Sequence, residues 1–85
     1  MKTFSYTIKE EEGIHARPAG LLFKEAGRYA SEILIHAGPK SARAVDLMDV
    51  MDLGGRCGQT VTVEITGEDE EAAYEGIKGF FETYL

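Results

Sequence analysis

The stretch around which this chain is organised is Gly13–Ala19, which reads GIHARPA. A glycine lets the backbone turn, and the segment that follows, at 21–26, has the apolar spacing of a helix. Pro18 suits a first helical turn, where a backbone N–H would have no partner within the helix. We therefore expect a helix to begin near Ala16, with His15 at its N-terminal end.

This predicted helix start has the features of an anion site. The backbone N–H groups of Ala16 and Arg17 are expected to point outward, unpaired, beside the imidazole of His15. The helix dipole favours negative charge at this end, and the Arg17 guanidinium binds phosphate oxygens. The stretch predicts a place for a phosphoryl group, whereas the structural alternative is a histidine that only caps the helix.

Composition is that of a soluble globular protein, with 44% hydrophobic and 28% charged residues among 85. This length predicts a single domain, residues 1–85. No run approaches the roughly 18 apolar residues of a membrane helix, so we expect a cytoplasmic protein without membrane insertion. Cys57 is the only cysteine, which excludes an internal disulfide and a cysteine metal cluster. The net charge of −6 argues against nucleic-acid binding.

Residue periodicity predicts four strands, at 3–9, 31–37, 40–44 and 60–66. It also predicts three helices, from 16 to 27 or 28, from 47 to 53, and from about 68 to the end. The order is β-α-β-β-α-β-α. These elements favour an α+β fold, a two-layer open-faced sandwich in which three helices cover one face of a four-stranded antiparallel sheet.

Several positions within these elements carry specific expectations. Gly27 is placed to end the first helix in a left-handed conformation. Gly76 and Gly79 are expected to weaken the last helix, each by about 1 kcal/mol relative to alanine if exposed. The core face of the first helix is expected to consist of Ala19, Leu22, Phe23 and Ala26. That of the last helix is expected to consist of Ala73, Ile77, Phe80 and Tyr84.

The short helix at 47–53 has more apolar residues than two turns need to bury. Asp46 is a good N-cap, and Val50 and Leu53 are spaced as a core face. The remaining apolar residues, Leu47, Met48 and Met51, are expected to form an exposed docking patch. The alternative is that all five apolar residues of this helix belong to the core. Asp46, Asp49 and Asp52 share one flank of this helix. A helix cap and a solvated surface explain them better than a metal site does.

Two segments resemble one known family. Gly13–Ala19 resembles the active-site signature of HPr, the histidine-containing phosphocarrier of the bacterial sugar phosphotransferase system, and 47–54 resembles that family's second helix. The resemblance implies that His15 accepts a phosphoryl group from enzyme I, itself phosphorylated by phosphoenolpyruvate, and passes it to the EIIA part of a sugar permease. Arg17 would help to hold the group. Phosphoryl transfer mainly needs positioning and charge stabilisation, so no cofactor or metal is expected.

The chain departs from this family at two positions. Asp46 stands where many members have a serine that a kinase phosphorylates in carbon catabolite repression, so that regulation should be absent. We hypothesise that Asp46, Asp49 and Asp52 keep the docking face permanently acidic, which should weaken transfer from an acidic enzyme I surface or mark a carrier with altered partners. Glu12 stands where small polar residues are commoner; its carboxylate would repel a phosphohistidine unless it points away.

Other readings of the function remain open from the sequence. A regulatory binding module, docking on a carbon-catabolite regulator, is the main alternative to the carrier. A carrier for a non-sugar pathway, such as one with a dihydroxyacetone kinase, is the third. Lys24 either guides an acidic partner or is an ordinary solvated lysine, and His36 is expected to be a surface or edge residue. A monomer is expected.

Overall fold

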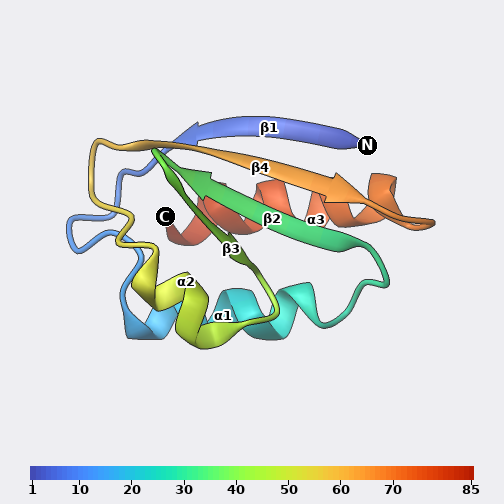
Figure 1. Ribbon diagram of the computed structural model, residues 1–85, viewed down its shortest axis with the longest axis horizontal. Helices are drawn as coiled ribbons and strands as arrows, with labels where there is room; N and C mark the ends of the chain where they lie inside the picture. Colours follow the sequence, from blue (N-terminus) through green and yellow to red (C-terminus); the bar gives the residue numbers. More distant parts are fainter.

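Four strands form one antiparallel sheet in the spatial order β1 (Lys2–Thr7), β4 (Thr60–Thr66), β2 (Glu32–Ala37) and β3 (Lys40–Arg43) (Figure 1). The computed structural model describes all residues from 1 to 85, and the order of its elements is the predicted one. Element ends differ from the predicted ends by one or two residues. The elements are β1 (Lys2–Thr7), α1 (Ala16–Ala26), β2 (Glu32–Ala37), β3 (Lys40–Arg43), α2 (Leu47–Asp52), β4 (Thr60–Thr66) and α3 (Glu70–Tyr84).

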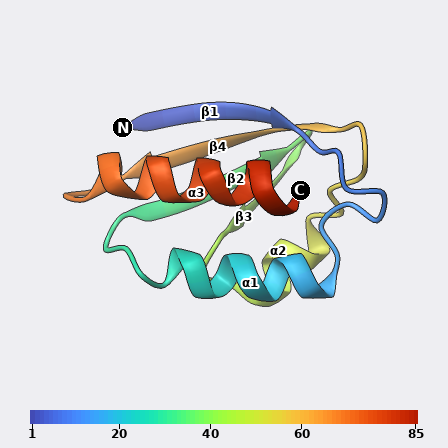
Figure 2. The ribbon, with the colours of Figure 1, turned by 180° about the vertical axis from the view of Figure 1, so that it is seen from behind.

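The two faces of the sheet differ because apolar and polar residues alternate along each strand. Val63 of β4 pairs with Phe4 of β1 on one side and with Ile35 of β2 on the other, and all three are buried. The helices pack against this apolar face (Figure 2). On the open face, hydroxyls pair across β1 and β4, with 2.8 Å between Oγ1 of Thr7 and Oγ1 of Thr60. The expected two-layer open-faced sandwich is confirmed.

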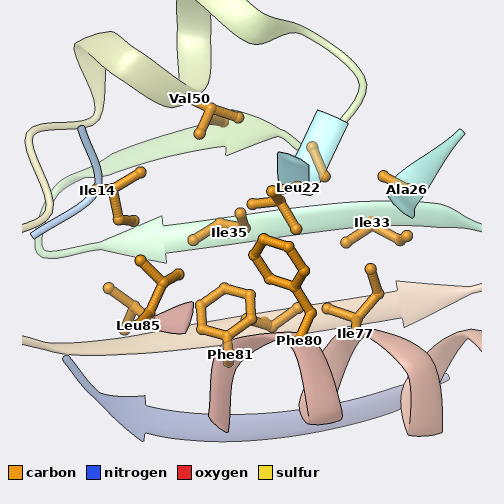
Figure 3. Close-up of a cluster of buried hydrophobic side chains, with 14 of the residues drawn as sticks. Ile14, Leu22, Ala26, Ile33, Ile35, Val50, Ile77, Phe80, Phe81 and Leu85 are labelled. Carbon is orange, nitrogen blue, oxygen red and sulfur yellow. The ribbon is translucent and has the colours of Figure 1, made fainter. Parts of the chain in front are cut away.

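The core lies between the sheet and the helices (Figure 3). Phe81 is fully buried and meets the ring of Phe4 edge to face at 5.6 Å. The prediction for α3 was wrong at Tyr84, which is 47% exposed, because α3 ends there and Leu85 enters the core instead. The predicted core face of α1 was also wrong at one residue. Phe23 is 42% exposed because the buried stripe of α1 is too narrow to include it.

The connection after α1 differs from the prediction at Gly27, which has a right-handed φ of −66° and donates to the carbonyl of Phe23. The chain therefore continues in a helical turn instead of reversing in a left-handed one. This turn brings Tyr29 back over α1, where its hydroxyl donates a hydrogen bond of 2.8 Å to Glu25. That hydrogen bond raises the pKa of Tyr29, because it stabilises the protonated phenol.

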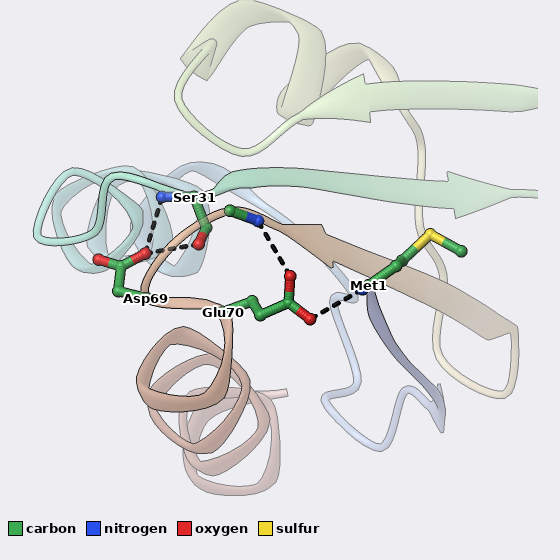
Figure 4. Close-up of polar contacts among 5 residues, drawn as sticks. Met1, Ser31, Asp69 and Glu70 are labelled. Carbon is green, nitrogen blue, oxygen red and sulfur yellow. Dashed lines mark hydrogen bonds and ion pairs between the residues drawn. The ribbon is translucent and has the colours of Figure 1, made fainter.

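A carboxylate joins the start of β2 to the start of α3 (Figure 4). Asp69 accepts hydrogen bonds from the N–H groups of Ala30 and Ser31 and from the Ser31 hydroxyl. The Ser31 hydroxyl contributes most to lowering the pKa of Asp69. Beside it, Glu70 accepts from the amino group of Met1 at 2.8 Å, which lowers the pKa of Glu70.

None of the three helices combines the length and apolar character needed to cross a bilayer.

Candidate functional site

His15 occupies the N-cap of α1, as the sequence predicts. Its backbone is extended, with φ −102° and ψ −173°, and its carbonyl accepts the N–H of Ala19 at 3.0 Å. Its imidazole makes no capping hydrogen bond, and its side chain is 34% exposed. The imidazole therefore does not cap the helix, which contradicts the alternative of a purely capping histidine, and part of the ring is open to solvent.

A close approach of two glycines fixes the backbone before His15. Gly13 has a left-handed φ of +67°, and a Cβ at this position would overlap the carbonyl oxygen of Gly55. That same oxygen accepts the N–H of Ile14 at 2.9 Å, and the Ile14 side chain is buried. The imidazole thus extends from a segment held by a glycine turn on one side and by α1 on the other.

Two backbone donors and one guanidinium remain unpaired beside the ring. The N–H groups of Ala16 and Arg17 donate no hydrogen bond within the protein, as expected for a first helical turn. Pro18, which has no N–H, is buried in the next position. The Arg17 side chain is exposed and takes part in none of the ion pairs of the structure. Unpaired donors and a cation at the positive end of a helix are chemically suited to an anion.

A cleft of about 420 Å³ lies beside these groups, between the start of α1 and the end of α3. Besides His15 and Arg17 it is lined by Glu12, Thr83 and Tyr84, among others. Sequence reasoning missed Thr83 and Tyr84 because nothing local signals that the last turn of α3 lies beside residue 15. The Glu12 carboxylate points toward the ring, with 3.5 Å between its Oε2 and Nδ1 of His15, which decides the orientation left open by the sequence.

The predicted docking residues of α2 divide into two groups. Met48 is 66% exposed, and Met51 is also exposed. Leu47 was expected to be exposed, but it is half-buried and packs against the core, so that prediction was wrong. Asp46 caps α2 as predicted, since its Oδ1 accepts the N–H of Asp49 at 3.1 Å. The large exposed apolar side chains of the helices are therefore the two methionines, Phe23 of α1 and Tyr84 of α3.

Lys24 and two of the aspartates line separate depressions of the protein surface. Lys24 is exposed on α1 and lines a groove between α1 and α3 with Tyr84, whereas the methionines lie on α2. Asp49 and Asp52 line a separate shallow pocket together with Lys40. No group of three or more His, Cys, Asp or Glu side chains is arranged to hold a metal ion. Asp46, Asp49 and Asp52 are all exposed.

His36 is not an edge residue, because β2 lies inside the sheet between β4 and β3. It is half-buried on the open face. Its Nδ1 lies 2.6 Å from Oγ of Ser41, and its Nε2 lies 3.0 Å from Oε1 of Glu64. Alternation on a strand flanked by two others would have placed it here. Both ring nitrogens of His36 have polar neighbours, whereas Nε2 of His15 takes part in no hydrogen bond or ion pair of the structure.

Comparison with known proteins identifies relatives over nearly the whole chain. Residues 2–83 match the family model described as "PTS HPr component phosphorylation site". The phosphocarrier protein HPr of Mycoplasma capricolum is 37% identical over 78 residues, which is 92% of this chain and 88% of that protein. The HPr-like protein Crh of Halalkalibacterium halodurans is 39% identical over 75 residues, covering 88% of this chain and 89% of that protein.

A solved structure agrees with these sequence matches. The crystal structure of HPr-C-His from Thermoanaerobacter tengcongensis superimposes with a TM-score of 0.91 at 34% identity. The superposition covers 98% of this chain and 93% of that one. Sequence, fold and element order thus give the same result, and the chain belongs to the HPr phosphocarrier family of the phosphotransferase system.

Proposed function

We propose that this protein carries a phosphoryl group on His15, taking it from phosphorylated enzyme I and giving it to the EIIA part of a sugar permease. The observation that carries the proposal is the site at the start of α1. There a half-buried, uncapped imidazole lies beside the unpaired N–H groups of Ala16 and Arg17 and an unpaired guanidinium. Transfer driven by phosphoenolpyruvate would take place in the cytoplasm.

The chemistry follows from these groups. The lone pair of a neutral His15 ring nitrogen attacks the phosphorus of the donor's phosphohistidine, forming a new P–N bond. The donor's P–N bond breaks, and its electron pair stays on the donor nitrogen. The transferred group carries negative charge, which the Ala16 and Arg17 N–H groups and the Arg17 guanidinium can bind. Transfer to EIIA is the same reaction with the histidine as donor.

Partner binding is proposed for the surface around the site. Exposed methionines adapt to partners of different shape, and Met48 and Met51 lie on the helix next to α1 (Figure 2). Arg17 and Lys24 supply positive charge on α1 itself, while Asp46 adds a fixed negative charge at the start of α2. We expect the carrier to work as a monomer, because its partners must each reach the same exposed imidazole.

Incubation with enzyme I and phosphoenolpyruvate, followed by intact mass measurement, tests the proposal. The expected result is one acid-labile phosphoryl adduct, which His15→Ala abolishes. The chain has only two histidines, so His36→Ala is a matched control that should keep the adduct. Absence of any adduct with active enzyme I would contradict the proposed function.

A second candidate function is a regulatory binding module in carbon catabolite control. Its support is the similarity to the HPr-like protein Crh, together with the aspartate at the position of the family's regulatory serine. The free imidazole of His15 favours the carrier over this alternative. A carrier for a non-sugar pathway, such as one with a dihydroxyacetone kinase, would use the same site, and an EIIA that accepts no phosphoryl group from phospho-His15 would favour it.

A further inference from the structure

We propose that Glu12 sets how tightly His15 holds its phosphoryl group, by competing with that group for the Nδ1 side of the ring. The inference rests on the proposed function and concerns its regulation. In this chain a carboxylate lies 3.5 Å from the imidazole of the expected acceptor. A carrier must give its phosphoryl group away as well as accept it, so a neighbour that weakens the hold has a use.

The local backbone places Glu12 at the ring. The turn closes with the Gly13 N–H donating to the carbonyl of Glu10 at 2.9 Å, and the left-handed Gly13 then leads the chain into α1. The N–H of Glu12 also lies 3.4 Å from the Glu10 carboxylate. Glu12 and His15 are three residues apart across this turn, and their side chains meet on the same side of it.

Nδ1 is also the nitrogen best placed to present a phosphoryl group to the helix. It occupies the same position along the side chain as the capping oxygen of an N-cap asparagine or aspartate, which reaches the first N–H groups of a helix. A phosphoryl group on Nδ1 would therefore reach the N–H groups of Ala16 and Arg17. The same group would lie against the Glu12 carboxylate, which must then move away from the ring.

Glu12 shifts the loading equilibrium of His15 toward the unphosphorylated ring through its effect on both the unphosphorylated and the phosphorylated state. Before transfer, the negative Glu12 carboxylate attracts the proton of the ring tautomer that carries it on Nδ1, which stabilises the unphosphorylated ring. That proton must pass through solvent to Nε2 before the Nδ1 lone pair can form the P–N bond, and it stays on Nε2 afterwards. The carboxylate now faces a phosphoryl group of the same sign and repels it. Arg17 and the two N–H groups attract the phosphoryl group, and Glu12 opposes them.

The expected size of the effect is modest because the carboxylate is exposed. The Glu12 side chain is 73% exposed, so water screens its charge. Repulsion between unit charges a few ångströms apart in water changes an equilibrium by a factor of about three to ten. Glu12→Gln keeps the shape of the side chain and removes the charge. It should raise the equilibrium constant for loading His15 by that factor.

The loading equilibrium can be measured with enzyme I at fixed ratios of phosphoenolpyruvate to pyruvate, reading the phosphorylated fraction by intact mass. Glu11→Gln is the matched control, because Glu11 is the neighbouring exposed residue and its loss changes the net charge equally. We expect Glu12→Gln to shift loading about threefold to tenfold and Glu11→Gln to leave it nearly unchanged. In about 1 M salt, where charges are screened beyond about 3 Å, the difference should shrink.

Three results would overturn the inference. Equal loading of Glu12→Gln, Glu11→Gln and the parent chain would show that the contact has no effect on the phosphoryl group. Lower loading of Glu12→Gln would show that the carboxylate stabilises the phosphorylated ring instead. A phosphoryl group found on Nε2 by NMR would remove the competition for Nδ1. A parent chain that takes no phosphoryl group at all would instead refute the proposed function itself, and the inference with it.

Discussion

The two glycines of α3 should respond in opposite directions to the same substitution. At Gly79, a Cβ would have no heavy atom within 4 Å, so alanine fits without strain. Alanine is favoured over glycine in a helix interior by about 1 kcal/mol, largely because glycine loses more backbone freedom on folding. Gly79→Ala should therefore stabilise the protein by about 1 kcal/mol. For a domain of this size that raises the Tm by roughly 4–8 °C.

At Gly76 the same change meets Tyr29. A Cβ there would overlap the Tyr29 hydroxyl and lie 2.9 Å from its Cζ and 3.0 Å from Oε2 of Glu25. The ring must move, which breaks the 2.8 Å hydrogen bond from Tyr29 to Glu25. Overpacking and a lost charged hydrogen bond together outweigh the helical gain, so Gly76→Ala should destabilise the protein by about 1–2 kcal/mol.

Urea denaturation, followed by circular dichroism, measures both effects on one scale. A Tyr29→Ala background supplies the control, because removing the ring leaves only the flexible end of Glu25 near the new methyl group. In that background Gly76→Ala should become stabilising, and the double-mutant cycle gives the size of the clash. Equal stabilisation by Gly76→Ala and Gly79→Ala in the parent chain would refute the reasoning, as would a destabilising Gly79→Ala.

Other residues give shorter tests. Asp69 has a lowered pKa, so its stabilising effect is complete above its unfolded pKa of about 3.9 and is lost as the pH falls through its folded value; the Tm gap between parent and Asp69→Ala should close in acid melts. Asp46→Ala should cost about 1 kcal/mol by removing the α2 cap, whereas Asp46→Ser should keep the stability and, by removing a charge, speed phosphotransfer from enzyme I, as rapid-quench rates would show. Met48→Gln should weaken partner binding in titration calorimetry with little change in Tm, since the side chain is exposed. Arg17→Ala should slow loading of His15 about tenfold to a hundredfold, and Arg28→Ala, which removes an arginine paired with Glu25, should not.

The fold could be predicted because its signals are local. Strand β4 alternates strictly, and the turn at 38–39 separates two strands of the same sheet, as expected. The errors came from effects that act between distant segments. Tyr84 has the spacing of a core residue but lies at the last turn of α3, where Leu85 takes the buried position. Periodicity also gave no reason for Gly76, which the structure explains by the close approach of Tyr29, a residue that follows the neighbouring helix α1.

The site was predicted unevenly for the same reason. The position of His15 at the start of α1 followed from Pro18 and the glycine turn, all within six residues. The orientation of Glu12 did not, because it depends on how the turn closes through the Gly13 N–H. On the α3 side, the cleft beside His15 is lined by Thr83 and Tyr84, nearly seventy positions away in the sequence, and no motif connects them with His15.

The segment that carries His15 and the segment that follows α2 meet at the contact between Gly13–Ile14 and Gly55. Gly55 comes shortly after α2, and its carbonyl holds the Ile14 N–H directly before His15. A side chain at Gly55 would press on Ile14, since a Cβ there would lie 2.7 Å from the Ile14 Cδ1. A substitution at Gly55 would therefore disturb the backbone directly before His15. This contact is a direct link between the segment that follows α2 and the segment that carries the imidazole.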